Sequence, residues 1–176
     1  PDSGQFGLLL EDLTLRQAHF PNVTEAVSLH YIKSLIETLA RLHAQFWESP
    51  RFDTDLNWVQ SHTEGALCEL QNRAATPLIQ HEIDQENFKR EMVQRLRTSG
   101  PELRGGMMAM HRHQATLPRT LLHGDTHLGN TYRLPGDKGG FLDWQLMTCG
   151  YGVHDISYLI CTALSVEQRR EHEQAL

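Results

Sequence analysis

The sequence predicts an α+β protein that is mostly helical. Hydrophobic residues recur at three- and four-residue steps through most of the first two thirds of the chain, which is the period of an α-helix. Short apolar runs flanked by turn-forming residues follow later, and these predict β-strands. Because helices and strands are segregated along the chain instead of alternating, the pattern argues against a doubly wound parallel sheet.

The composition is that of a globular domain. The chain has 176 residues, of which 39% are apolar and 22% charged, and this excludes a disordered tail or a low-complexity linker. The net charge of −6 argues against a general nucleic-acid binder, which needs a basic face. The longest apolar runs, 8–10 and 159–161, are far shorter than the ~20 residues that span a bilayer. We therefore expect neither a nucleic-acid partner nor a membrane span.

The cysteines indicate a reducing environment. Cys68, Cys149 and Cys161 are odd in number and include no Cys-x-x-Cys pair, so neither a disulfide framework nor a thiolate zinc site is indicated. The chain carries no charged-then-apolar segment typical of a secretory signal. These features predict a cytoplasmic location.

The first part of the chain predicts a strand and a long helix. Residues 8–10 are expected to form a short buried strand, followed by a turn at residues 11–13. The clearest helix runs from about Thr24 to Trp47, with Asn22 or Thr24 as its cap and Pro50 beyond its end. Its apolar face comprises Leu29, Ile32, Ile36, Leu39, His43 and Phe46, widened by Leu35 and Leu42.

The remaining elements follow from the same signals. A weaker helix over 63–75 is expected to stop before Pro77, and a helix over 84–98 carries Phe88, Met92, Val93 and Leu96 on one face. Further elements are predicted as a helix over 102–113, strands over 120–122, 131–134 and 140–144, a helix over 154–163, and a capping box from Ser165 to Gln168 that opens a last helix.

The polar segment 123–130 directly follows an apolar strand and carries the most informative residues. Asp143 ends the apolar run that starts at Phe141, thirteen residues past Asn130. A β-turn between the two strands folds Asp143 back beside Asn130, so Asp125, Asn130 and Asp143 are expected to converge. Two carboxylates and an amide oxygen are hard ligands that suit Mg²⁺.

This spacing matches the general layout of a phosphoryl-transfer site. In that layout one Asp accepts the proton of the attacking hydroxyl, while an Asn five residues later and an Asp after a strand hold the metal ions. Asp125 is therefore predicted to be the catalytic base that positions the acceptor hydroxyl. Asn130 and Asp143 are predicted to be the Mg²⁺ ligands.

The segment 123–130 reads His-Gly-Asp-Thr-His-Leu-Gly-Asn, which resembles the His-Gly-Asp-x-His-x-x-Asn loop of the aminoglycoside phosphotransferase and choline kinase superfamily. The segment 142–145 is similar to that superfamily's version of the kinase Asp-Phe-Gly segment, and 152–159 is similar to its Asp-x-x-Tyr-Leu segment. Residues 6–13 resemble the strand and hinge between the two lobes, and 39–44 resemble its Leu-Ala-x-Leu-His helix. Among the branches of this superfamily, the sequence is most similar to the ecdysteroid-kinase-like and related bacterial phosphotransferases.

This resemblance implies the C-terminal lobe of a protein-kinase-like fold, with a small β-hairpin beside the catalytic loop. It divides the chain into a hinge strand over 1–13, a helical part over 14–118, and a part over 119–176 that holds the catalytic loop, the metal-binding hairpin and the following helices. The N-terminal nucleotide lobe is expected to be absent. No Gly-rich loop precedes Leu8, and the lysines stand at the wrong places to hold phosphates, namely Lys33, Lys89 and Lys138. We therefore expect a piece of a longer protein that is inactive as a kinase by itself.

The resemblance further implies ATP-dependent transfer of the γ-phosphoryl group to a hydroxyl of a small molecule. The acceptor classes left open are aminoglycosides, choline-like amino alcohols and steroid-like alcohols. ATP and Mg²⁺ are the implied cofactors. Glu11, Asp12 and Leu13 are expected to present backbone groups to the adenine ring.

Three side chains are expected to support the loop rather than react, namely His123, His127 and Asp155. Asp155 is expected to accept hydrogen bonds from the loop.

Two other functions remain open at this point. A metal-dependent hydrolase would use His123, Asp125 and His127 as ligands, but it leaves the spacing of Asn130 and Asp143 unexplained. A catalytically silent, pseudokinase-type binding module would be indicated by loss of Asp125, Asn130 or Asp143, and all three are present.

Overall fold

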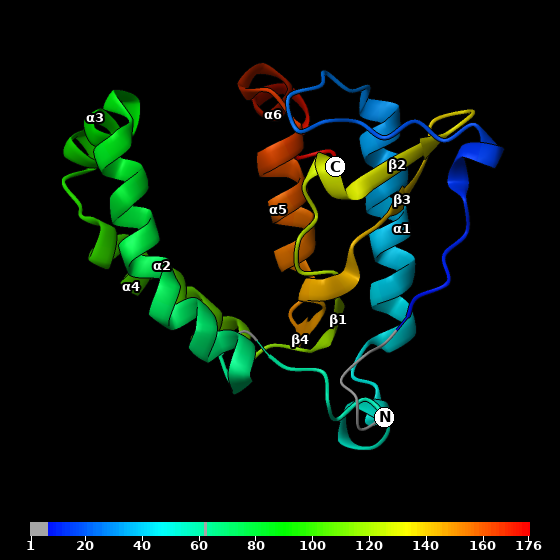
Figure 1. Cartoon of the computed structure of the whole chain (residues 1–176), viewed down its shortest axis with the longest axis horizontal. Coiled ribbons are helices and arrows are strands. Elements are labelled where there is room, and N and C mark those ends of the chain that lie inside the picture. The colour runs from blue at the N-terminus through cyan, green and yellow to red at the C-terminus, as the bar shows by residue number, and fades with distance from the viewer. Residues whose placement is uncertain (1–6, 62) are drawn as a thin grey trace.

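The structure is a computed structural model that describes residues 7–61 and 63–176. A compact core holds the long helix α1, the short strands and the helices α5 and α6, and a three-helix arm of α2, α3 and α4 extends away from it (Figure 1). The α+β class, with helices predominating and small antiparallel sheets, is confirmed.

The core is organised by α1 (Leu29–Phe46). The helix begins five residues later than predicted, because Ser28 is its cap and accepts a hydrogen bond from the Tyr31 amide. Asn22 instead closes a local turn onto the amide and hydroxyl of Thr24. The buried face of α1 comprises Tyr31, Ile32, Leu35, Leu39 and His43.

Two small antiparallel sheets lie against α1. β1 (Thr120–Leu122) pairs with β4 (Thr148–Gly150), and β2 (Thr131–Leu134) pairs with β3 (Lys138–Phe141). The predicted strand over 140–144 ends early, because Asp143 adopts a left-handed conformation with φ of 58° and a 3₁₀ turn follows it over Trp144–Leu146. The sequence pattern did not predict β4, whose residues pair with β1 and, at Cys149, also form a parallel bridge with Ser61.

The helices that follow the sheets close the core. α5 (Val153–Ala163) packs against α1, and α6 (Val166–His172) begins at the predicted capping box of Ser165 and Gln168, which is confirmed. The main hydrophobic cluster of buried residues comprises Val27, Tyr31, Ile32, Leu35, Leu39, Leu128, Phe141, Leu159, Ala163 and Leu164.

The arm differs from its prediction at one point. α2 (Gly65–Gln85) continues past Pro77, so the expectation that it stops there was wrong. Pro77 is exposed and removes one helical hydrogen bond, but α2 packs against both α3 (Asn87–Leu96) and α4 (Gly100–Gln114), which supports the helix on both sides of the proline. Ser99 caps α4 through a hydrogen bond from the Glu102 amide.

The expected strand at Leu8–Leu10 is a second correction. These three leucines are highly exposed, and residues 7–12 form neither helix nor strand. Within the described residues, no strand pairs with this segment, so its backbone has no ladder to join. A short 3₁₀ turn over Leu13–Arg16 follows, with Asp12 as its cap. The part of the predicted hinge strand at residues 1–6 lies outside the described residues.

None of the helices in residues 7–61 and 63–176 is long and apolar enough to cross a membrane.

Candidate active site

The loop 123–130 follows β1 and is held in place by hydrogen bonds to Asp155 of α5. Asp155, which is fully buried, accepts hydrogen bonds from the backbone amides of His123 and Gly124, both at 2.9 Å. Its carboxylate also accepts a bond of 3.0 Å from Nε2 of His43 on α1, and its backbone carbonyl accepts one of 2.7 Å from the Thr126 hydroxyl. One aspartate thus fixes the start of the loop to two helices.

Asp155 is stabilised in its charged form by these donors. Burial alone raises the pKa of the Asp155 carboxyl, but the hydrogen bonds from His43, Gly124 and His123 outweigh burial and lower that pKa below its usual value. A buried carboxylate needs such partners, because an unpaired buried charge is costly.

Glycine is the one residue type that fits at position 124 of the loop. Its φ of 85° lies in the left-handed region, and a Cβ atom there would overlap the backbone carbonyl of Leu146. The loop and the 3₁₀ turn after Asp143 therefore touch backbone to backbone at this point.

His123 links the loop to the end of the β2–β3 hairpin. Its Nδ1 accepts a bond of 3.2 Å from the Asp125 amide, and its Nε2 donates one of 2.7 Å to the Leu142 carbonyl. The ring packs beside Phe141 and Trp144, with ring centroids 5.2 and 4.6 Å away. Because both ring nitrogens are engaged, His123 is not available as a metal ligand, which counts against the hydrolase reading.

Asp125 and Asn130 are directly joined. The amide nitrogen Nδ2 of Asn130 donates to the carboxylate Oδ2 and to the backbone carbonyl of Asp125, both at 2.9 Å. The Asn130 nitrogen therefore faces Asp125, and its oxygen Oδ1 is the atom of the amide suited to a cation. Nε2 of His127 lies 3.5 Å from the same Oδ2. Burial and the neighbouring Asp125 carboxylate raise the pKa of the Tyr158 phenol.

Asp143 stands at the surface beside this pair. Its neighbour Leu142 donates its amide hydrogen to the Asn130 carbonyl at 2.8 Å, so the chain that carries Asp143 is bonded to the chain that carries Asn130. The Asp143 side chain is exposed, and its one described hydrogen bond is a long one, 3.4 Å, from Gln145. A free carboxylate oxygen and an amide oxygen on bonded segments fit the hard-oxygen preference of Mg²⁺.

Among the described residues, those expected to contact adenine make their hydrogen bonds and ion pairs with their own neighbours in sequence, and not with the loop 123–130 or Asp143. Glu11 forms an ion pair with Arg16 at 3.5 Å, and Asp12 accepts hydrogen bonds from Thr14. The carbonyl of Leu13 accepts the amide of Ala18. Adenine binding by Glu11, Asp12 and Leu13 stays a prediction.

Sequence reasoning did not identify two of the supporting contacts. The sequence placed His43 only on the apolar face of the long helix, whereas it donates directly to Asp155. The Thr126 hydroxyl was given no role. The signal for both is weak in sequence, because the partners lie 112 and 29 positions away.

A loop of this kind, with an aspartate bonded to an asparagine and a second aspartate after a hairpin, has the layout expected of a kinase-like phosphotransferase. Comparison with protein-family models agrees: the phosphotransferase enzyme family matches residues 2–176, and the chain belongs to it. Searches of curated proteins and of solved structures found no match. Family membership indicates an enzyme that transfers phosphate, and enzymes of this family generally use ATP and Mg²⁺ and act on small molecules. The finer assignment to the ecdysteroid-kinase-like branch stays a prediction.

Proposed function

We propose that the protein transfers the γ-phosphoryl group of ATP to a hydroxyl group of a small molecule, with Asp125 at the reacting oxygen. The observation that carries this proposal is the Asp125 carboxylate, bonded to Asn130 on a loop that Asp155 holds in place. Phosphoryl transfer needs little covalent chemistry from the protein, so positioning and charge neutralisation provide most of the catalysis.

Asp125 supplies the acceptor for the hydroxyl proton. Its side chain is 21% exposed, and Asn130 donates to its Oδ2, which also lies close to Nε2 of His127. The Tyr158 hydroxyl shares a hydrogen bond with the same carboxylate, and the exposed part of the side chain is where an incoming hydroxyl would meet it. A carboxylate fixed in this way orients the attacking oxygen and accepts its proton as the new bond to phosphorus forms.

Asn130 and Asp143 are the residues that would hold Mg²⁺. The metal ion, when bound, neutralises phosphate charge. The protein contributes oxygen ligands on two segments that the Leu142–Asn130 backbone bond joins. Asp143 is free to turn toward a cation because only Gln145 contacts its carboxylate among the described residues.

The acceptor is a hydroxyl compound whose class stays open among aminoglycosides, choline-like amino alcohols and steroid-like alcohols. The net charge of −6 favours a cationic acceptor slightly, since opposite charge raises the local concentration of a substrate.

The test is Mg²⁺-dependent phosphate transfer from ATP by the full-length chain, assayed against a pool that represents the three acceptor classes. The expected result is transfer to one class that is abolished by removing Mg²⁺. Phosphate release from ATP that is independent of every acceptor, or no binding of ATP at all, contradicts the proposal.

A further inference from the structure

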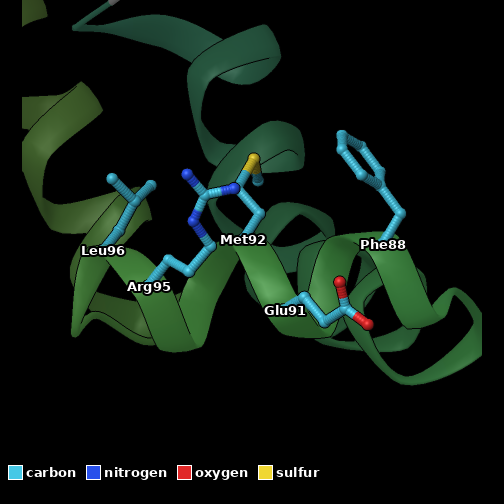
Figure 2. A pocket seen from close by; sticks show the side chains of 5 residues that line it. All are labelled: Phe88, Glu91, Met92, Arg95 and Leu96. Atoms are coloured by element: carbon cyan, nitrogen blue, oxygen red, sulfur yellow. The ribbon is translucent and has the colours of Figure 1, made fainter.

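The hollow on the outer arm does not lead to Asp125. It holds about 330 Å³ and is lined by five side chains of α3 alone, as Figure 2 shows. α3 lies at the end of the arm farthest from the catalytic loop (Figure 1). The described side chains that surround the Asp125 carboxylate come from the core instead, namely from the loop itself and from α5.

α5 presents one face to the loop. In its first turn, Asp155 accepts hydrogen bonds from the amides of His123 and Gly124, where the loop begins. α5 also packs against the 3₁₀ turn Leu128–Asn130, where the loop ends. Because residues three positions apart lie on the same face of a helix, Tyr158 follows Asp155 on the face of α5 that meets the loop.

Tyr158 reaches the catalytic carboxylate through its hydroxyl group. The side chain is half-buried, and its hydroxyl shares a hydrogen bond with Asp125. In this bond the phenol donates, because an ionised carboxylate has no proton to give. Burial and the Asp125 carboxylate raise the pKa of the Tyr158 phenol, so the hydroxyl keeps its proton at neutral pH and remains a donor.

The contacts of the Asp125 carboxylate come from two elements. Nδ2 of Asn130 donates to Oδ2 at 2.9 Å, and Nε2 of His127 lies 3.5 Å from the same oxygen. Both residues belong to the loop that carries Asp125, so they move with it. Among the described residues, Tyr158 is the one that reaches this carboxylate from another element. The last side-chain torsion of an aspartate turns easily, and a donor fixed on a helix restrains that rotation.

We propose that Tyr158 is a positioning residue for phosphoryl transfer, whose hydroxyl holds the Asp125 carboxylate in the orientation that meets the acceptor. This inference rests on the proposed function, which places Asp125 at the acceptor hydroxyl. The proton of that hydroxyl goes to Asp125, and Tyr158 neither gives nor takes one. Loss of the Tyr158 hydroxyl therefore lowers the rate of the chemical step, because a catalytic group that is less well oriented loses rate.

The test compares Tyr158→Phe with the wild-type full-length chain in Mg²⁺- and ATP-dependent transfer to the acceptor. The substitution keeps the ring and removes one hydrogen bond, so Tm should fall by no more than about 4 °C. We expect kcat to fall by about tenfold, while KM for ATP stays within about twofold of wild type. Ser157→Ala is the matched control. It removes an exposed hydroxyl from the same helix, one that donates to the His154 carbonyl, and should leave kcat unchanged.

A second comparison separates action through Asp125 from a general structural effect. In the Asp125→Asn background, Tyr158→Phe should lower the residual kcat by less than about twofold, because no carboxylate remains to be oriented. A further tenfold loss in that background overturns the proposal, since Tyr158 then acts independently of Asp125.

The remaining outcomes distinguish this inference from the proposed function. A Tyr158→Phe variant that keeps wild-type kcat, beside an Asp125→Asn variant that loses it, overturns the role of Tyr158 alone. A wild-type chain that transfers no phosphate, or an Asp125→Asn variant with wild-type kcat, overturns both.

Discussion

Replacement of Asp155 by Asn removes the anchor of the catalytic loop while changing its shape very little. The wild-type carboxylate accepts from His43 and from the amides of His123 and Gly124. An Asn side chain offers only one acceptor oxygen. Its NH₂ group would replace the other carboxylate oxygen and would face an N–H donor of the loop or of His43. Leaving these buried donors without a charged acceptor costs about 3–5 kcal/mol, since a hydrogen bond to a charged group is worth about 1.5–3 kcal/mol.

For a chain of this size, each kcal/mol lowers Tm by about 2–4 °C, so Asp155→Asn should lower Tm by roughly 10 °C at neutral pH. The assay is thermal unfolding followed by circular dichroism, combined with hydrogen exchange of the His123 and Gly124 amides, which should lose protection. A drop of less than about 2 °C, with protection retained, would refute the argument that Asp155 anchors the loop.

The pH dependence gives a second check on the same residue. The pKa of Asp155 is lowered in the folded state, so its contribution is present above the unfolded pKa, about 3.9, and is lost as pH falls through the folded value. The Tm difference between wild type and Asp155→Asn should therefore be constant near neutrality and shrink below about pH 4. A difference that disappears already near pH 6 would mean that another group is responsible.

Three further predictions follow. Gly124→Ala should strongly lower both Tm and the rate of phosphate transfer, because the residue has a φ of 85° and a Cβ atom would overlap the Leu146 carbonyl. Unchanged activity in a coupled assay would contradict this. Asp143→Asn should leave Tm within about 1–2 °C, because the side chain is exposed and Asn tolerates left-handed φ, while Mg²⁺-dependent transfer falls by at least about tenfold. Burial lowers the pKa of His111 and His154, whose rings are 5.8 Å apart, so stability should fall as pH drops below about 6.5, where the unfolded histidines bind protons. Tm measured between about pH 7.5 and 5.5 should fall less steeply in His111→Gln, and an unchanged slope would remove this histidine from the account.

The sequence predicted best where local chemistry decides the structure. The capping box of Ser165 and Gln168 and the turn between β2 and β3 depend on residues close in sequence. The expectation that Asn130 returns beside Asp143 rested on that turn, and the Leu142 amide does bond the Asn130 carbonyl.

Prediction failed where distant parts of the chain decide. Asn22, Thr24 and Ser28 are all acceptable caps, and Ser28 is the one whose hydroxyl accepts a hydrogen bond from the first turn of α1. Pro77 reads as a stop, yet contacts with α3 and α4 carry α2 through it. The leucines at 8–10 read as a buried strand, but a strand needs a partner that sequence alone does not supply.

The site follows the same rule. The five-residue spacing of Asp125 and Asn130 is local, and their side chains are bonded. The support from His43 to Asp155 spans 112 positions and depends on how α1 packs against α5, so spacing gives no sign of it.

The most direct test of the central claim is the Asp125→Asn variant of the full-length chain in Mg²⁺- and ATP-dependent transfer to its acceptor. The variant keeps an oxygen that can accept from Asn130, so its Tm should match wild type within a few degrees. We predict that kcat falls by at least about 100-fold, the contribution typical of a positioned acid or base, while ATP still binds. A folded Asp125→Asn protein that retains kcat within about tenfold of wild type would contradict the assignment of Asp125 as the catalytic base.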